Sequence, residues 1–247
     1  MYVKLKTPKI GIIGGTGYEN FSLIKKWQTK AIRTRYGEVQ VKTGKFGDKV
    51  VIFLARHGFK YNHAPHHINY HANIAALRKE GVNYIITTSA VGSMNPQMEP
   101  GDLVLISDFI DFTKHRRNTF YGRKPIYTDM SHAYDPRLRE KIKEATQSLN
   151  VKLHPEAVYV CTEGPRFETP AEIRMFQRMG ADVVGMTYVP EVVLAAEVGI
   201  PYAALALVTN MAAGISPKRL SAEEVFEMMR KKGAIITKIF GRLIETL

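Results

Sequence analysis

Short apolar runs alternate with segments of helical periodicity along almost the whole chain. Continuous apolar runs are typical of buried strands, whereas apolar residues spaced three and four apart indicate amphipathic helices. The predicted strands span residues 9–13, 49–55, 84–88, 103–110, 157–161, 183–186 and 202–209, and the predicted helices span 69–80, 137–149, 171–179, 190–198 and the segment from 222 onward. This order predicts an α/β sandwich built on a mostly parallel, buried sheet.

Polar and glycine-rich clusters follow several predicted strands, at residues 14–17, 56–58, 89–93 and 162–165. Ligands of α/β proteins bind at the carboxyl ends of the strands, so these clusters are expected to converge on one pocket. No linker, repeat or low-complexity stretch divides the sequence, which predicts one domain over residues 1–247. The least regular stretch, residues 113–135, is expected to form a long loop or a subunit contact.

The composition indicates a globular protein of a reducing compartment. Hydrophobic residues make up 45% of the chain, yet no apolar run approaches the roughly 18 residues of a membrane span. The amino-terminal segment lacks the apolar stretch of a signal peptide. The single cysteine, Cys161, has no partner for an internal disulfide. We therefore expect a cytoplasmic protein that makes no membrane contact.

The net charge of +12 raises the question of nucleic-acid binding. The basic residues are scattered, and their densest cluster is the short run 114–117, without zinc-finger spacing or an RNA-binding aromatic motif. This distribution argues against a nucleic-acid partner. A positive field instead raises the local concentration of anions such as phosphate.

Two polar clusters have the chemistry of an anion site. The glycine turn around Thr16 lacks the spacing of a dinucleotide fingerprint or a P-loop, so it is either a tight turn without a ligand or a turn at which Thr16 donates to an anion. Arg56 offers a guanidinium fork that matches phosphate oxygens, with His57 beside it, unless both are solvated surface residues. Ser89 and Ala90 are small enough either to admit a ligand or to pack closely.

Four histidines have partial metal-site spacing, at positions 63, 66, 67 and 71. His67 and His71 are four residues apart, but no glutamate in an HExxH frame and no nearby cysteine completes a ligand set. We expect these to be polar or loop histidines, and we expect no metal.

Taken together, the chain resembles the trimeric purine nucleoside phosphorylase and methylthioadenosine phosphorylase family in eight ordered motifs: GIIGGTG, LARHG, NYHANIAAL, TTSAVGSM, PGDLVLISDFID, EGPRFETPAE, GMTYVPEVVLA and VTN. The resemblance implies a three-layer α/β sandwich with a mostly parallel, mixed central sheet flanked by helices, the phosphorylase/hydrolase-like fold. It implies one nucleoside phosphorylase domain, a pentosyltransferase of purine salvage that cleaves a nucleoside with inorganic phosphate and needs no cofactor. It also implies a homotrimer or a dimer of trimers.

By the same resemblance, the phosphate site combines five groups, which are Thr16, Arg56, His57, the backbone amide of Ala90, and Thr187. Positioned donors and positive charge orient phosphate below the anomeric carbon and stabilise the reacting charges. Ser89 lies in the same motif as Ala90 and is a candidate substrate contact. Met186 corresponds to the residue that packs on the ribose and Phe167 to the aromatic residue beside the base, although both residue types also suit a protein core.

The residues expected near the base indicate a 6-oxopurine. Members that act on adenine carry an aspartate after the last strand and a second one two residues later, where this chain has Asn210 and Ala212. An asparagine amide donates to a 6-keto oxygen and accepts from a protonated N7, and Glu168 matches a glutamate that accepts from purine N1–H. Inosine and guanosine are therefore the expected substrates, with Asn210, His57 and Arg56 as candidate catalytic residues.

The sugar's 5′ end leaves an alternative open. Inosine-type members place a histidine near the start of the last helix, where this chain has Ala222, followed by Val225 and Phe226. An apolar wall tolerates a 5′-methylthio group, so 5′-methylthioinosine or 5′-methylthioadenosine phosphorolysis is the second candidate. The chain also departs from many relatives at Tyr61, where they have a histidine, with His63 two positions further on.

Segment 113–135 aligns poorly with the family, in which a neighbouring subunit lends an aromatic residue or a histidine to the sugar pocket. Phe120, Tyr121 and Tyr127 are candidates for that role. A hydrolase of related fold and a non-catalytic nucleoside- or RNA-binding protein are less favoured, because neither needs the complete phosphate set.

Overall fold

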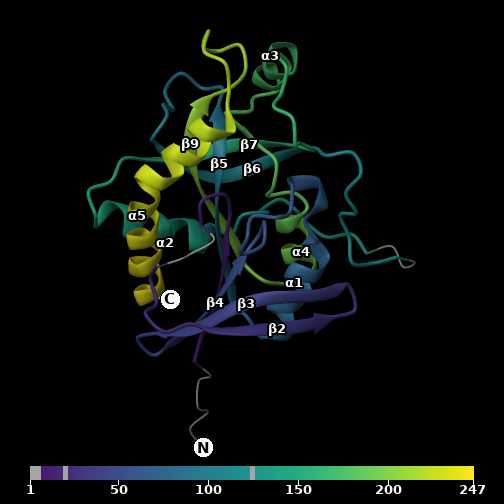
Figure 1. Ribbon diagram of the computed structural model, residues 1–247, viewed down its shortest axis with the longest axis vertical. Helices are drawn as coiled ribbons and strands as arrows, with labels where there is room; N and C mark the ends of the chain where they lie inside the picture. Colours follow the sequence, from purple (N-terminus) through teal and green to yellow (C-terminus); the bar gives the residue numbers. More distant parts are fainter. Residues whose placement is uncertain (1–6, 19–21, 123–125) are drawn as a thin grey trace, which may run out of the picture.

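A nine-stranded mixed sheet runs through the described part of the chain, which comprises residues 7–18, 22–122 and 126–247 of the computed structural model (Figure 1). The strand order is β2-β3-β4-β1-β5-β8-β7-β6-β9. The bounds are β1 Lys9–Gly14, β2 Gln28–Thr34, β3 Gly37–Phe46, β4 Lys49–Ala55, β5 Tyr84–Ser93, β6 Leu103–Phe112, β7 Leu153–Thr162, β8 Val183–Gly185 and β9 Tyr202–Met211.

Five of these strands close on themselves. Besides pairing with β1 and β8, strand β5 pairs in parallel with β9, so that β5, β8, β7, β6 and β9 form a continuous ring. The β5–β8 and β6–β9 pairs are antiparallel, whereas β1 is parallel to both of its neighbours. The predicted α/β fold with a mixed, mostly parallel sheet flanked by helices is confirmed. The closure of the ring was not predicted.

Helices cover both faces of the sheet (Figure 1). Helices α1 (Tyr70–Lys79) and α4 (Glu191–Glu197) share one apolar core with the sheet, and α2 (Pro136–Gln147) and α5 (Ala222–Thr246) share the other. Strand β1 contributes to both, since Ile12 belongs to the core that contains α5 and Ile13 to the core that contains α1. Burial on both faces explains the continuous apolar runs of the central strands.

Two helix starts fix segments that matter for the site. Helix α3 (Pro170–Arg178) begins with a capping box, in which the Thr169 side chain accepts from the backbone of Glu172 and the Glu172 carboxylate accepts from the backbone of Thr169. At the start of α5, the Ser221 hydroxyl accepts from the backbone N–H of Glu224. These caps fix the residues at which α3 and α5 begin.

The structure corrects the sequence prediction in two places. Strands β2 and β3 form an edge hairpin that was not predicted, because their residues are mostly polar and only Ile32, Val39 and Val41 are buried. Strand β5 continues through Ser93 and β9 through Met211, so Ser89, Ala90 and Asn210 lie in strands and not in turns. Small and polar residues have weak strand propensity, but pairing on neighbouring strands keeps them extended here.

None of the helices in the described residues is long and apolar enough to span a membrane.

Candidate functional site

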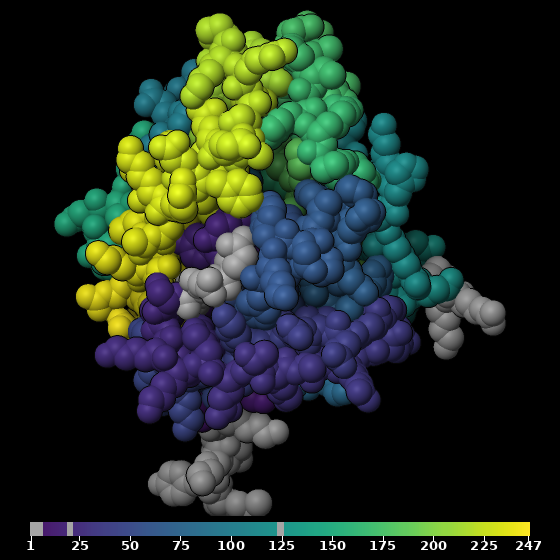
Figure 2. Space-filling model, in the orientation of Figure 1, coloured from purple at the N-terminus to yellow at the C-terminus, as the bar shows by residue number. Residues whose placement is uncertain are grey.

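A cavity of about 410 Å³ opens at the carboxyl ends of β1, β4 and β5, beside β9 and the first turns of α5. Its volume lies within the range of about 300–1,000 Å³ that is typical of small-molecule sites. The blue segment that follows β4 and the yellow helix α5 meet over it at the front of the molecule (Figure 2). The cavity therefore lies where parallel strands of an α/β sheet present their ligands.

The cavity brings together nearly every residue predicted from the sequence. The predicted residues that line it are Thr16, His57, Ser89, Ala90, Phe167, Glu168, Met186, Thr187, Asn210, Ala212, Ala222 and Val225. The exception is Arg56, which lies behind the wall. Lining residues that the sequence did not single out for the site include Leu220 and Thr209.

Thr16 reaches the cavity because its loop packs tightly on β5. A Cβ atom at Gly15 would lie 2.7 Å from the carbonyl oxygen of Thr88 and 3.0 Å from Nη1 of Arg56, so only glycine allows this approach. The turn closes with a hydrogen bond from the Tyr18 N–H to the Gly15 carbonyl. Beyond the turn, the Thr16 Oγ1 lies 3.0 Å from the Tyr61 hydroxyl.

Arg56 is held by a buried network. Its Nε and Nη2 donate to the two carboxylate oxygens of Glu191 at 2.8 Å each, and both side chains are fully buried. The Nη1 group donates to the Thr88 carbonyl oxygen at 3.2 Å, and Nη2 also donates to the Thr87 hydroxyl. The Tyr202 hydroxyl donates to Glu191 at 2.7 Å. The guanidinium is therefore fixed in orientation by residues of β5, α4 and β9.

The ion pair determines the charge of this side of the cavity. Burial by itself lowers the pKa of Arg56, but the adjacent Glu191 carboxylate outweighs it and raises the pKa, so Arg56 stays cationic. The contacts above engage four of the five guanidinium N–H groups. The fifth is on Nη1, the nitrogen that lies against Gly15. Sequence reasoning missed Glu191, although a carboxylate within the apolar run of α4 was the available signal.

His57 is neutral and has a defined tautomer. Burial lowers its pKa to about 4; the contact with the His63 carbonyl opposes this shift, and the charge of Arg56 adds to it. The Nδ1 atom lies 2.8 Å from that carbonyl oxygen. Because a carbonyl only accepts, Nδ1 carries the proton and Nε2 is left as the hydrogen-bond acceptor of the ring.

Thr187 presents an unsatisfied hydroxyl to the same wall. Its Oγ1 is buried and has no hydrogen-bond partner among the described residues, while its backbone N–H donates to the Tyr159 hydroxyl at 3.0 Å. Buried polar groups are rarely left unpaired. A hydroxyl of this kind in the wall of a cavity is therefore available to a ligand.

Glu168 occupies the opposite wall. It is buried, and the Thr162 hydroxyl donates to its Oε1 at 2.6 Å. Burial raises the pKa of Glu168, and the hydrogen bond from Thr162 only partly offsets this shift. Phe167, beside it, is 37% exposed and lines the cavity, which is more exposure than a core phenylalanine has.

Asn210 and Ala212 meet this wall from the end of β9. The Asn210 amide oxygen accepts from the Thr209 hydroxyl at 2.8 Å, and its Nδ2 donates to the Met211 carbonyl at 3.0 Å. Each amide group keeps one further hydrogen-bonding position. A Cβ at Gly92, the residue paired with Asn210, would lie 3.2 Å from that Nδ2, so glycine leaves room for the amide.

The remaining side of the cavity is apolar and aromatic. It is formed by Ala222, Val225 and Phe226 of α5. The rings of Phe226 and Tyr61 meet edge to face with 5.1 Å between centroids. The sequence marked Tyr61 only as a departure from the family pattern, and its place in the cavity wall was not predicted.

Within segment 113–135, two of the three aromatic candidates pack on their own chain. Phe120 is buried against Tyr36 and His71, and the Tyr121 hydroxyl donates to the Glu197 carbonyl. Tyr127, in contrast, is 92% exposed. Residues 123–125 of the segment lie outside the described residues.

The histidines with partial metal spacing make other contacts. His71 lies 2.8 Å from the Thr119 carbonyl, and the rings of His66 and His67 contact each other at a tilt of 48° in the short 3-10 helix η1 (Pro65–His67). In the described residues, no group of three or more histidine, cysteine, aspartate or glutamate side chains is arranged to hold a metal ion.

The fold is that of a phosphorylase-type α/β protein. The family model of the phosphorylase superfamily matches residues 9–245, and the chain belongs to this family. A 6-oxopurine nucleoside phosphorylase of Pyrococcus furiosus is 48% identical over 240 residues, covering 94% of this chain and 90% of the relative. A probable S-methyl-5′-thioinosine phosphorylase of Methanopyrus kandleri is 46% identical over 238 residues, covering 96% and 92%.

Among solved structures, the methylthioadenosine phosphorylase of Schistosoma mansoni in complex with adenine superposes with a TM-score of 0.94. The two chains are 32% identical, and the match covers 97% of this chain and 92% of the other. The family predicted from the eight motifs is confirmed.

Proposed function

We propose that the protein is a 6-oxopurine nucleoside phosphorylase, which uses inorganic phosphate to convert inosine or guanosine into the free base and ribose 1-phosphate. Membership of the phosphorylase superfamily supports the enzyme class, a nucleoside phosphorylase and pentosyltransferase. The observation that carries the substrate assignment is the convergence of Asn210 and Glu168 with the phosphate donors in one cavity. Residues 1–247 would act as one domain, and no cofactor is needed for this chemistry.

In this proposal the cavity has two halves. The phosphate half consists of Thr16, His57, Ala90 and Thr187, with Arg56 behind them. Thr16, Thr187 and the Ala90 amide donate to phosphate oxygens, and the free Nη1 proton of Arg56 turns to the same anion. His57 Nε2 accepts from the hydroxyl of hydrogen phosphate. The donors are fixed before the substrate arrives, which is the condition for electrostatic preorganisation.

The nucleoside half consists of Ser89, Phe167, Glu168, Met186, Asn210, Ala212, Ala222, Val225 and Phe226. A phosphate oxygen bonds to C1′ while the C1′–N9 bond breaks, the electron pair of the C1′–N9 bond moves onto the purine, and the departing purine takes up a proton from water at N7. Asn210 stabilises that charge by donating to the 6-keto oxygen and accepting from protonated N7, and Glu168 accepts from N1–H. Phe167 covers the base and Met186 packs against the ribose.

A second candidate is 5′-methylthioinosine phosphorolysis. The observation that favours it is the apolar wall of Ala222, Val225 and Phe226, which gives a 5′-hydroxyl no hydrogen-bond partner and suits a thioether. Relatives named for both activities match the chain at similar identity. Comparison of kcat/KM for inosine and 5′-methylthioinosine decides between the two.

We also propose that the protein is a homotrimer or a dimer of trimers, with Tyr127 entering the sugar pocket of a neighbour. Its exposure supports this choice, because Phe120 and Tyr121 are engaged within their own chain. The buried thiol of Cys161 is compatible with the predicted cytoplasmic location. Light scattering measures the assembly; a fully active monomer would contradict the proposal.

The primary experiment measures free-base release from inosine, guanosine, adenosine, 5′-methylthioinosine and 5′-methylthioadenosine, each with and without phosphate. We expect phosphate-dependent release of hypoxanthine and guanine, with little adenine. Adenine release at a comparable rate would contradict the roles of Asn210 and Glu168. Release that does not depend on phosphate would indicate a hydrolase instead.

A further inference from the structure

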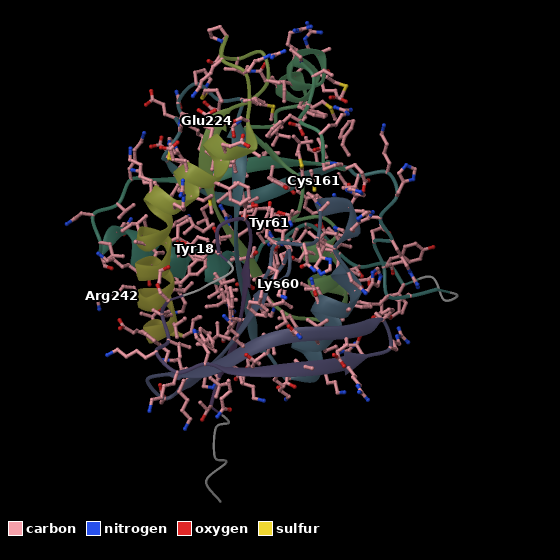
Figure 3. All side chains as sticks on the ribbon, in the orientation of Figure 1. Tyr18, Lys60, Tyr61, Cys161, Glu224 and Arg242 are labelled. Carbon is pink, nitrogen blue, oxygen red and sulfur yellow. The ribbon has the colours of Figure 1, made fainter. Side chains whose placement is uncertain are left out.

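Tyr61 lies where the two halves of the cavity meet, and the proposed function gives it no role. Figure 3 labels it near the centre of the molecule, between α5 and α1. Its hydroxyl is 3.0 Å from Thr16 Oγ1, and its ring centroid is 4.8 Å from that of His57 and 5.1 Å from that of Phe226. One side chain therefore contacts two groups of the phosphate half and one of the nucleoside half.

The hydroxyl contact determines what Thr16 can do for an anion. A threonine hydroxyl has one proton, so it donates to phosphate only if its other neighbours donate to it. The Tyr61 phenol can supply such a donor, and an anion beside Thr16 selects this direction. The chain of hydrogen bonds then runs from Tyr61 to Thr16 to phosphate, and each bond strengthens the next.

The ring contact restrains His57. The two rings are inclined to each other by 38° and are in contact. The Nδ1 atom is already engaged by the His63 carbonyl. Together the two contacts restrict rotation of the ring, and Nε2 is left as its hydrogen-bond acceptor.

Tyr61 makes these contacts from an unfavourable backbone conformation. Its φ of +50° lies in the left-handed region, which a bulky residue rarely adopts. The loop is kept there by hydrogen bonds from the N–H groups of Asn62 and His63 to the His57 carbonyl and from the Tyr61 N–H to the Gly58 carbonyl. Strain of this kind is typical of functional loops.

We propose that Tyr61 is the positioning residue of the phosphate half, where its hydroxyl orients the Thr16 hydroxyl and its ring orients the His57 imidazole. This inference rests on the proposed function. It predicts that the loss of Tyr61 acts on phosphate and not on the nucleoside, although the ring also contacts Phe226.

The test measures KM for phosphate at saturating nucleoside, KM for nucleoside at saturating phosphate, and kcat. Tyr61→Phe keeps the ring and removes the hydroxyl, so KM for phosphate should rise about fivefold, the effect of one hydrogen bond. KM for nucleoside and kcat should each change by less than about twofold. Tyr61→Leu also removes the ring contact and should raise KM for phosphate further. The control is Tyr84→Phe, at the opposite end of β5, which should change none of the three.

A double variant tests the route through Thr16. If the Tyr61 hydroxyl acts on phosphate only through Thr16, then Tyr61→Phe should have no further effect on KM for phosphate in a Thr16→Val background. Additive effects would overturn the inference, and so would an unchanged KM for phosphate or an equal rise in KM for nucleoside. If Tyr61→Leu does not fold, Tyr61→Phe alone is sufficient to test the inference. A wild-type protein without phosphate-dependent base release would overturn the proposed function itself, which is a different result.

Discussion

The phosphate half of the cavity is held from behind by buried charges and hydrogen bonds, whereas the nucleoside half is walled largely by small, apolar and aromatic side chains. Arg56 has a carboxylate partner and His57 a carbonyl partner before any ligand is bound. In the nucleoside half, the polar groups with a proposed role are Glu168 and Asn210, and Phe167 is partly exposed. On the proposed assignment, phosphate binding and base recognition thus rest on different structural supports.

Relatives of this chain at similar identity bear names for different nucleosides. Changes in the phosphate half disturb a network that ties β4, β5, α4 and β9 together. Changes in the nucleoside half replace single side chains at the ends of β9 and α5 and leave that network intact. We therefore expect substitutions in the first half to affect stability and activity together, and those in the second half to affect activity or specificity alone.

The largest effect is expected for Arg56→Ala. It leaves the Glu191 carboxylate buried without its cation, which typically lowers the free energy of unfolding by about 3–5 kcal/mol, and phosphate-dependent turnover should be lost. Denaturant unfolding followed by circular dichroism measures the first effect. Arg242→Ala is the control, because it breaks a surface pair with Glu245 (Figure 3 labels Arg242) and should change stability by about 1 kcal/mol or less.

The double variant Arg56→Met with Glu191→Leu separates the two effects. Replacing both charges by apolar groups should restore much of the stability without restoring the use of phosphate. Equal stability of the Arg56→Ala and Arg242→Ala variants would contradict the structural role assigned to the ion pair.

Asn210→Ala should reduce kcat by about a hundredfold, within the usual range for loss of a proton-sharing group. The Asn210 amide bonds only to its chain neighbours Thr209 and Met211 among the described residues, so the free energy of unfolding should fall by no more than about 1 kcal/mol. Steady-state kinetics and denaturant unfolding of the same preparation test both statements. A loss of stability in proportion to activity would make Asn210 a structural residue.

Asn210→Asp should change specificity more than rate. A protonated aspartate donates to N7 of a 6-aminopurine, and we expect the ratio of kcat/KM for adenosine to that for inosine to rise about tenfold, the effect of one hydrogen bond. Asn210→Ala is the control, since it lacks both donor and acceptor. An unchanged ratio in Asn210→Asp would contradict the proposed origin of base choice.

The same division decides what the sequence could predict. Residues at the ends of buried strands, such as Thr16, His57 and Asn210, converge on one cavity because strand topology brings them there. The partner of Arg56 lies 135 residues away, and the pair forms only when α4 docks on the sheet. Strands β2 and β3 escaped prediction because an edge hairpin buries few residues. Contacts between loops, such as that of Tyr61 with Thr16, likewise depend on tertiary structure.

The smallest effect concerns the pH dependence of the nucleoside half. Because burial raises the pKa of Glu168, its ionised form, which accepts from N1–H, is present only above that raised value. As the pH is lowered, activity on inosine should therefore begin to fall at a higher pH than it would if Glu168 had the usual glutamate pKa of about 4.3. His57, whose pKa is about 4, stays neutral over most of this window. The ionisation of phosphate is common to all variants.

Dividing kcat/KM of the wild type by that of Glu168→Gln cancels the ionisation of phosphate and of His57, which both proteins share. We expect the ratio to be constant at neutral and alkaline pH and to fall as the pH drops through the pKa of Glu168, approaching tenfold per pH unit for a single ionisation. The sign for stability is opposite: the protonated form of Glu168 is favoured by folding, so its contribution to stability is present at low pH and is lost as the pH rises through the raised pKa. Parallel pH profiles of the two proteins would show that Glu168 does not meet the base as an anion.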